Sequence, residues 1–165
     1  MKTIPWIVFA LMLLLAVFYV TGSVSGLPLL VASHFDSNGD PDAYMPRKSY
    51  TMFVLILSVG LPLALVALLT VVYSKARDMK LPNRDYWLAP ERIAQTRAML
   101  VDHGVWFGTT MTAMVCFVHW LELDAHRTVP PHLSSQLFAG GLAAFLLITL
   151  GWIFVLLRAF RLPRA

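Results

Sequence analysis

Four side chains have the types and spacing to bind a metal ion: His34, His119, Glu122 and His126. His119 and Glu122 are three residues apart, so they share one face of a helix, and His126 follows farther along if that helix continues. Two or three imidazoles with a carboxylate suit zinc or another divalent ion. The spacing matches no closed ligand motif, and polar residues also mark the hydrated end of an apolar helix. A divalent-metal site or membrane-embedded metalloenzyme and a hydrated helix end are both open interpretations.

The segment Asp36-x-Asn38-x-Asp40 resembles the start of a calcium-binding loop. An EF-hand continues with glycine and ends on glutamate, whereas the corresponding positions here hold Pro41 and Arg47. The sequence therefore excludes an EF-hand. Asp36 and Asn38 are expected to cap turns with their own side chains.

Other chemistry has little support in the residue pattern. Asp102 and His103 are adjacent and could form a proton relay or a hydrated helix end. Cys116 lies inside an apolar run, where a thiol is expected to be inert. The sequence shows no Ser/His/Asp order and no Gly-rich phosphate loop, so the chain is more consistent with a non-enzymatic protein and carries no predicted catalytic residue.

The elements that must position these side chains are membrane helices. The chain of 165 residues is 58% hydrophobic and 13% charged, with a mean hydropathy of +0.69. Soluble domains are about 25% charged. Uncharged runs near 4–20, 51–73, 104–121 and 133–157 are each long enough to cross a bilayer core of about 30 Å. We predict an all-α integral membrane protein, a single four-helix transmembrane bundle over residues 1–165. A cleaved signal peptide is a less favoured interpretation of the first run.

The distribution of charge predicts the orientation. With both termini in the cytoplasm, Arg47, Lys48 and Arg127 lie outside, and the other ten of the thirteen basic residues lie inside. Basic residues concentrate in the cytoplasmic loops of membrane proteins, which supports this topology. The same distribution explains the pI near 9.5 without nucleic-acid binding. The ten are Lys2, Lys75, Arg77, Lys80, Arg84, Arg92, Arg97, Arg158, Arg161 and Arg164.

Both long loops are expected to be ordered. The outer loop, 21–50, is rich in proline and glycine, which favours a compact set of turns against the membrane surface. The inner loop, 74–103, carries aromatic residues suited to the headgroup region, and Pro90 with Glu91 predicts a helix that begins there and runs into the third span. Gly60 and Pro62 predict a kink in the second span.

Small residues could bring helices close together. Gly104 with Gly108, and Gly140 with Ala144, have the spacing of small-residue helix contacts. Either pair could form a homo-oligomer, but close packing within one bundle is the favoured interpretation.

Two loop motifs resemble those of a known bacterial family. The outer loop contains His34-Phe35 followed by Asn38-Gly39-Asp40-Pro41-Asp42, and the inner loop contains Pro82-Asn83 followed by Tyr86-Trp87-Leu88-Ala89-Pro90-Glu91-Arg92. Together they are similar to the domain of unknown function 1648, a membrane module related to the N-terminal part of SdpI-type immunity proteins. The resemblance covers the first three spans. Tyr44 stands where the family commonly has tryptophan, and those immunity proteins carry further spans.

The resemblance implies a multi-pass protein of the bacterial inner membrane with a recognition, immunity or signalling role. On this interpretation the outer loop would bind a peptide or membrane-protein partner, and the inner loop would meet a cytoplasmic partner. The recognition-loop residues would be His34, Phe35, Asn38, Gly39, Pro41 and Asp42. A purely structural loop is the alternative.

Overall fold

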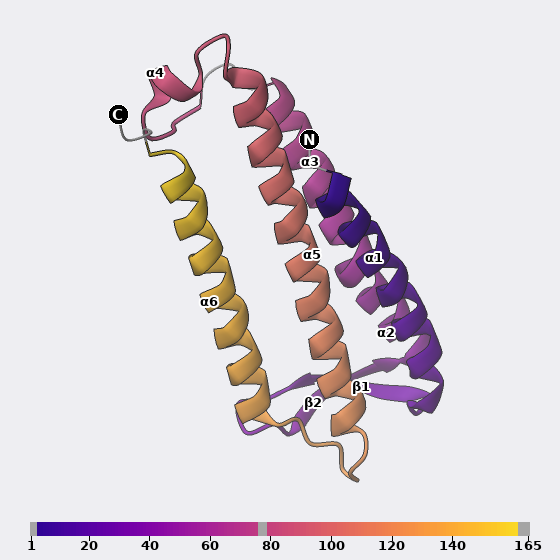
Figure 1. Ribbon diagram of the computed structural model, residues 1–165. Coiled ribbons are helices and arrows are strands. Elements are labelled where there is room, and N and C mark those ends of the chain that lie inside the picture. The colour runs from indigo at the N-terminus through magenta and orange to yellow at the C-terminus, as the bar shows by residue number, and fades with distance from the viewer. Residues whose placement is uncertain (1–2, 76–78, 162–165) are drawn as a thin grey trace.

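Four long helices dominate the computed structural model, which describes residues 3–75 and 79–161 (Figure 1). Each is long and apolar enough to cross a membrane, as predicted. The helices are α1 (Thr3–Ser23), the continuous stretch of α2 (Arg47–Leu55), a π-helical turn (Ile56–Gly60) and α3 (Leu61–Lys75), then α5 (Ile93–Ala125) and α6 (Ser135–Ala159). Of the predicted cytoplasmic basic residues, Lys2, Arg77 and Arg164 lie outside the described ranges.

Helix α5 is the centre of the bundle. It packs against α1 and α3 on one side and against α6 on another (Figure 1). Phe9, Val66, Val101 and Val105 form a core between α1, α3 and α5. Helix α6 has no buried residue, so most of its apolar surface faces outward, as expected for a helix in contact with lipid.

The glycines of α5 serve packing within the chain. A Cβ added at Gly108 would lie 2.5 Å from Val66 Cγ2 and 3.2 Å from Phe9 Cε2, and one at Gly104 would lie 3.2 Å from Leu69 Cδ1. Glycine therefore permits the close approach of α1 and α3 to α5. Gly140 on α6 has no such neighbour within 4 Å.

The irregularity predicted in the second span is a π-helical turn directly before Leu61. The Leu61 N–H donates to the carbonyl of Ile56 in the wider π pattern. Pro62 has no N–H to give to the Ser58 carbonyl, which explains why the regular ladder is interrupted here.

The outer loop, predicted over 21–50 as a compact set of turns, contains two short strands that the sequence analysis did not predict. Strands β1 (Leu30–Phe35) and β2 (Pro41–Pro46) form an antiparallel hairpin that lies across one end of the bundle, called here the hairpin end (Figure 1). Val31 is fully buried in a cluster with Val20, Leu27 and Tyr50. Burial of this strand face packs the hairpin against the ends of the helices.

The opposite end of the bundle carries the short helix α4 (Arg84–Trp87) and is called the α4 end. Helix α5 begins at Ile93 and not at Pro90, because the Ala89 carbonyl accepts hydrogen bonds from the N–H groups of both Arg92 and Ile93 and closes a turn first. The helix then continues into the third span as predicted, which shortens the inner loop. Helix α6 begins after Ser134, whose side chain accepts from the Leu137 N–H at 3.3 Å.

Candidate functional site

His119 is buried at the hairpin end and uses both ring nitrogens. Its Nδ1 lies 2.7 Å from the Tyr50 hydroxyl, and its Nε2 lies 2.9 Å from Ser23 Oγ. Ser23 Oγ also lies 2.6 Å from the carbonyl oxygen of Tyr19. A carbonyl only accepts, so Ser23 donates to Tyr19 and accepts from His119 Nε2–H. Nδ1 then accepts from Tyr50, and the imidazole joins α1, α2 and α5 in its neutral form.

His126 joins helix α5 to the hairpin. Its Nε2 accepts a hydrogen bond from the Ala32 backbone N–H at 3.1 Å. Its Nδ1 therefore carries the proton and donates to the Glu122 carbonyl at 2.9 Å, with Glu122 Oε1 3.4 Å away. Glu122 is 7% exposed, and its Oε1 has no hydrogen-bond partner. The two side chains form a buried polar contact under the hairpin.

The predicted metal residues divide into two places. Glu122 and His126 lie together, but His34 pairs with Asp42 at 2.5 Å on the exposed side of the hairpin. Over residues 3–75 and 79–161, no three His, Cys, Asp or Glu side chains are grouped so that they could hold a metal ion. A metal at His119 would also have to displace Tyr50 or Ser23. The divalent-metal site stays a prediction from the sequence.

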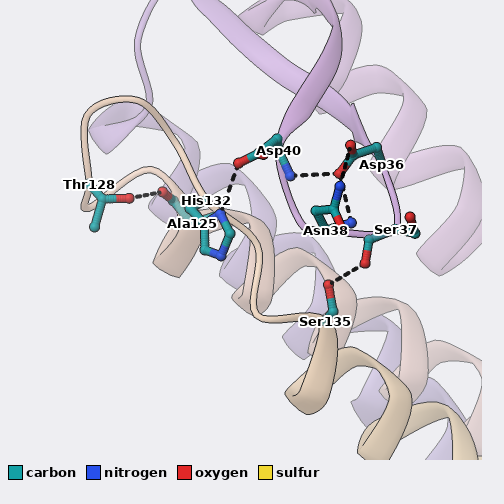
Figure 2. A network of polar contacts seen from close by, with 8 residues as sticks. All are labelled: Asp36, Ser37, Asn38, Asp40, Ala125, Thr128, His132 and Ser135. Atoms are coloured by element: carbon teal, nitrogen blue, oxygen red, sulfur yellow. Dashed lines mark hydrogen bonds and ion pairs between the residues drawn. The ribbon is translucent and has the colours of Figure 1, made fainter.

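The tip of the hairpin is an Asx turn (Figure 2). Asp36 Oδ1 accepts from the backbone N–H groups of Asn38 at 2.8 Å and Asp40 at 3.0 Å. These bonds, the one from Asp40 above all, hold the pKa of the Asp36 carboxyl below its ordinary value. Gly39 has a φ of +91°, a conformation that favours glycine. The turn-capping role predicted for Asp36 is confirmed.

This tip is docked on the loop between α5 and α6 (Figure 2). Leu133 N–H donates to the Gly39 carbonyl at 2.9 Å, and His132 Nδ1 lies 3.2 Å from Asp40 Oδ1. Ser135 Oγ donates to the Ser37 carbonyl at 3.2 Å. A Cβ at Gly39 would lie 2.1 Å from the Leu133 carbonyl oxygen, so only glycine permits this approach.

The base of the hairpin is fixed as well. The Arg47 guanidinium donates from Nη1 to the carbonyl oxygens of Leu27 at 2.8 Å and Ser25 at 3.2 Å. The Arg47 backbone N–H donates to the Leu29 carbonyl at 2.9 Å. With the Ala32–His126 bond in the middle and the docked tip, the hairpin is held at three places.

One face of this fixed hairpin is open. The side chains of His34 and Asp42 are 70% and 49% exposed, and Tyr44 beside them is 50% exposed. Leu29 and Leu30 are exposed as well. We call these five residues the hairpin surface: Leu29, Leu30, His34, Asp42 and Tyr44.

The six predicted recognition-loop residues therefore separate by role. His34 and Asp42 belong to the hairpin surface. Asn38 and Gly39 build the turn, and Phe35 pairs in register with Pro41, both half-buried. Leu29 and Leu30 were not predicted as surface residues. They lie in one apolar run with Leu27 and Val31, which are buried, so the local sequence does not distinguish the exposed members.

The inner-loop motif closes the C-terminal end of α6. Asn83 Nδ2 and Trp87 Nε1 both donate to the Phe160 carbonyl, at 2.8 and 2.9 Å, and the Trp87 and Phe160 rings meet edge to face. Thr96 Oγ1 donates to the Trp87 carbonyl at 2.8 Å. The last carbonyl groups of a helix have no hydrogen-bond donors within the helix. Asn83 and Trp87 of this motif supply donors to the carbonyl of Phe160.

The remaining residues of the inner-loop motif lie around α4. The Arg92 guanidinium carbon lies 4.0 Å from the centre of the Tyr86 ring, and Arg92 Nη1 lies 3.2 Å from Glu91 Oε1. Pro82 and Pro90 lie on either side of α4. Their positions give the motif a structural role at the α4 end.

Comparisons with family models, curated proteins and solved structures find no match to this chain. The resemblance to the domain of unknown function 1648 stays a prediction from the two loop motifs.

Proposed function

We propose that the protein is a non-enzymatic recognition module of a bacterial inner membrane, and that the hairpin surface binds a peptide or membrane-protein partner. The observation that carries this proposal is the combination of rigidity and exposure. The hairpin is fixed at base, middle and tip, yet His34, Asp42 and Tyr44 project into the open. A pre-ordered surface binds with little loss of conformational entropy.

The proposed orientation puts the hairpin outside and both termini in the cytoplasm. The α4 end carries seven of the described basic residues, and the positive-inside rule assigns such an end to the cytoplasm. Those residues are Lys75, Lys80, Arg84, Arg92, Arg97, Arg158 and Arg161. The hairpin then meets partners that arrive from outside the membrane.

The partner is best matched by a basic, amphipathic peptide segment. Asp36, Asp40 and Asp42 are all exposed on the hairpin, which favours a positively charged partner. Tyr44, two residues after Asp42, and Leu29 and Leu30 near the base of the hairpin supply exposed apolar contact area. The resemblance to SdpI-type immunity proteins supports the same class, because those proteins act against a secreted peptide.

Side chains, rather than the strand edge, would provide the recognition. The Ala32 N–H donates to His126 and so points away from β2. Tyr44 is opposite Ala32 in the register, and because the two residues are not hydrogen-bonded to each other, the Tyr44 N–H and carbonyl point to the free edge of β2. Pro41 and Pro46 at the two ends of β2 remove donors from that edge. The prolines limit addition of a partner strand to the short middle of β2 around Tyr44, so side chains are expected to provide most of the recognition.

A comparison of two double variants tests the proposal. Asp42→Asn with Tyr44→Ser alters the hairpin surface, and Arg127→Gln with Val129→Ser alters exposed residues at the same end of the bundle. Each would be purified from native membranes beside the wild type after mild cross-linking. We expect a partner in constant ratio to the chain for wild type and for the Arg127/Val129 variant, and its loss for the hairpin variant. Equal recovery in all three would refute the proposal.

A further inference from the structure

A groove between α3 and α6 runs to the α4 end of the bundle, remote from the hairpin. It consists of two adjoining cavities of about 260 and 360 Å³, and Tyr73, Leu100 and Leu156 line both of them. Helix α5 forms its floor, because α3 and α6 pack mainly on α5 (Figure 1). Ligand sites of about 300–1,000 Å³ with largely apolar walls and a few polar groups are typical of proteins.

The walls of the groove are largely apolar and open toward the membrane. Apolar side chains of three helices line it, among them Leu69 of α3, Phe107 of α5 and Ile153 of α6. Ile153 and Leu157, both in the wall, are 46% and 50% exposed, so the groove opens at the outer surface of the bundle. Because α3 and α6 belong to helices that can cross a membrane, a lipid chain can enter this opening from the side.

Two polar groups in the wall are available to a ligand. Tyr73 lies two residues before the end of α3, and its hydroxyl has no hydrogen-bond partner among the described residues and is not fully buried. Lys80 lines the cavity nearer the α4 end, where its side chain is exposed and makes no ion pair in the described part of the chain. A hydroxyl and an ammonium group are hydrogen-bond donors, which suit the ester and phosphate oxygens of a lipid.

The charge around this end of the groove favours an anion. Among the described residues the α4 end carries seven basic side chains and three acidic ones, and basic residues at a membrane surface attract anionic lipids. The loop that carries Lys80 is also held in place. Asn83 and Trp87 donate to the carbonyl of Phe160, which lines the same cavity as Lys80.

We propose that the groove binds one anionic phospholipid. An acyl chain of the lipid lies along the apolar walls between α3 and α6, and the phosphate and ester oxygens accept hydrogen bonds from Lys80 and the Tyr73 hydroxyl. This site is independent of the proposed recognition function, because none of its residues belongs to the hairpin surface.

The test compares two phospholipids that differ only in the head group. Dioleoyl phosphatidylglycerol is anionic and dioleoyl phosphatidylcholine is zwitterionic, and their binding to the protein in maltoside micelles is measured by native mass spectrometry. We expect one phosphatidylglycerol per chain, bound saturably and about fivefold more tightly than phosphatidylcholine. Equal affinities for the two lipids, or a dimer of the chain that binds neither, would overturn the proposal.

Two variants separate the polar contacts. Lys80→Gln removes the cation and should bring the affinities for the two lipids together, whereas Lys48→Gln, at an exposed lysine of the hairpin end, should leave the preference unchanged. Tyr73→Phe removes a hydroxyl donor and should weaken the binding of both lipids about threefold. A wild-type preference in Lys80→Gln, or wild-type affinities in Tyr73→Phe, would contradict the proposed contacts.

A third variant tests the groove itself. Leu156→Trp places a larger side chain where the two cavities adjoin and should abolish saturable binding of both lipids. Leu150→Trp is the matched control, because Leu150 is 61% exposed on the same helix and lines neither cavity. Saturable binding retained in Leu156→Trp would overturn the proposal. If Leu156→Trp does not fold, the comparison of the two lipids on wild type and on Lys80→Gln still decides.

Discussion

Removal of the Tyr50 hydroxyl should destabilise the bundle, because it deprives a buried imidazole of a hydrogen bond. Tyr50→Phe keeps the ring but leaves His119 Nδ1 without its donor at 2.7 Å. Hydrogen bonds inside membrane proteins average about 0.6 kcal/mol and reach about 1.7 kcal/mol. His119 is 1% exposed, so water cannot replace the hydroxyl, and we expect a loss toward the upper value.

The matched control is Tyr19→Phe. Tyr19 also contacts the His119 ring, edge to face at 5.4 Å, but in the described part of the chain its hydroxyl makes no hydrogen bond. This substitution should leave the free energy of unfolding nearly unchanged. The assay is reversible unfolding in mixed micelles, followed by tryptophan fluorescence.

A double-mutant cycle isolates the interaction. In a His119→Ala background Tyr50→Phe should cost less than in wild type, with a coupling energy of about 1 kcal/mol. Equal effects of the two tyrosine substitutions, or a coupling energy near zero, would refute the assignment of His119 as the polar junction of α1, α2 and α5.

Three further outcomes follow from the described contacts. Gly108→Ala should destabilise the bundle by about 1–3 kcal/mol through overpacking against its neighbours, whereas Gly140→Ala, with open space around it, should be neutral or mildly stabilising in the same unfolding assay. Acidification should loosen the hairpin tip. Because the pKa of Asp36 is lowered in the folded protein, its ionised carboxylate stabilises the fold at pH values above the ordinary aspartate pKa, and this stabilisation is lost as the pH falls through the lowered pKa. Hydrogen exchange at the tip should therefore increase below about pH 4 in wild type and change less in Asp36→Asn. With Cys116 replaced by serine, an impermeant maleimide applied to intact cells should label a cysteine at Val129 and not one at Lys80, and the reverse pattern would invert the proposed topology.

The four helices could be predicted because hydropathy is a local signal. A bilayer requires about 20 apolar residues per crossing, and each of the four runs satisfies that requirement without reference to the others. The close packing of Gly108 was predictable for the same reason, since small residues four apart mark one helix face.

The hairpin was not predictable from an alternation of apolar and polar residues. Register shifts between Ala32 and His34, and between His34 and Phe35, break the two-residue period of β1. Pro41 and Pro46 mark the ends of β2, where proline is read as a turn or loop signal. The capping role of Asp36 was identified correctly, because an Asx turn is formed by neighbours in the chain, whereas the Asn38 side chain donates to the Asp36 carboxylate and caps no backbone group in the described structure.

The buried polar site depends on contacts between distant residues. Tyr50 and Ser23 lie 69 and 96 residues from His119, and no spacing rule relates such positions. The sequence marked His119 as unusual because it is an ionisable residue inside an apolar run. Its role as a helix junction, with both nitrogens in hydrogen bonds, required the packing of three helices.

The most direct test of the hairpin surface is photo-cross-linking in native membranes. A photoreactive amino acid replaces Tyr44 in one variant and Val129, which is 98% exposed at the same end of the bundle, in the other. The proposal predicts a discrete peptide or protein adduct from position 44 that disappears when Asp42→Asn is added, and no such adduct from position 129. Adducts to lipid alone, or the same adducts from both positions, would contradict it.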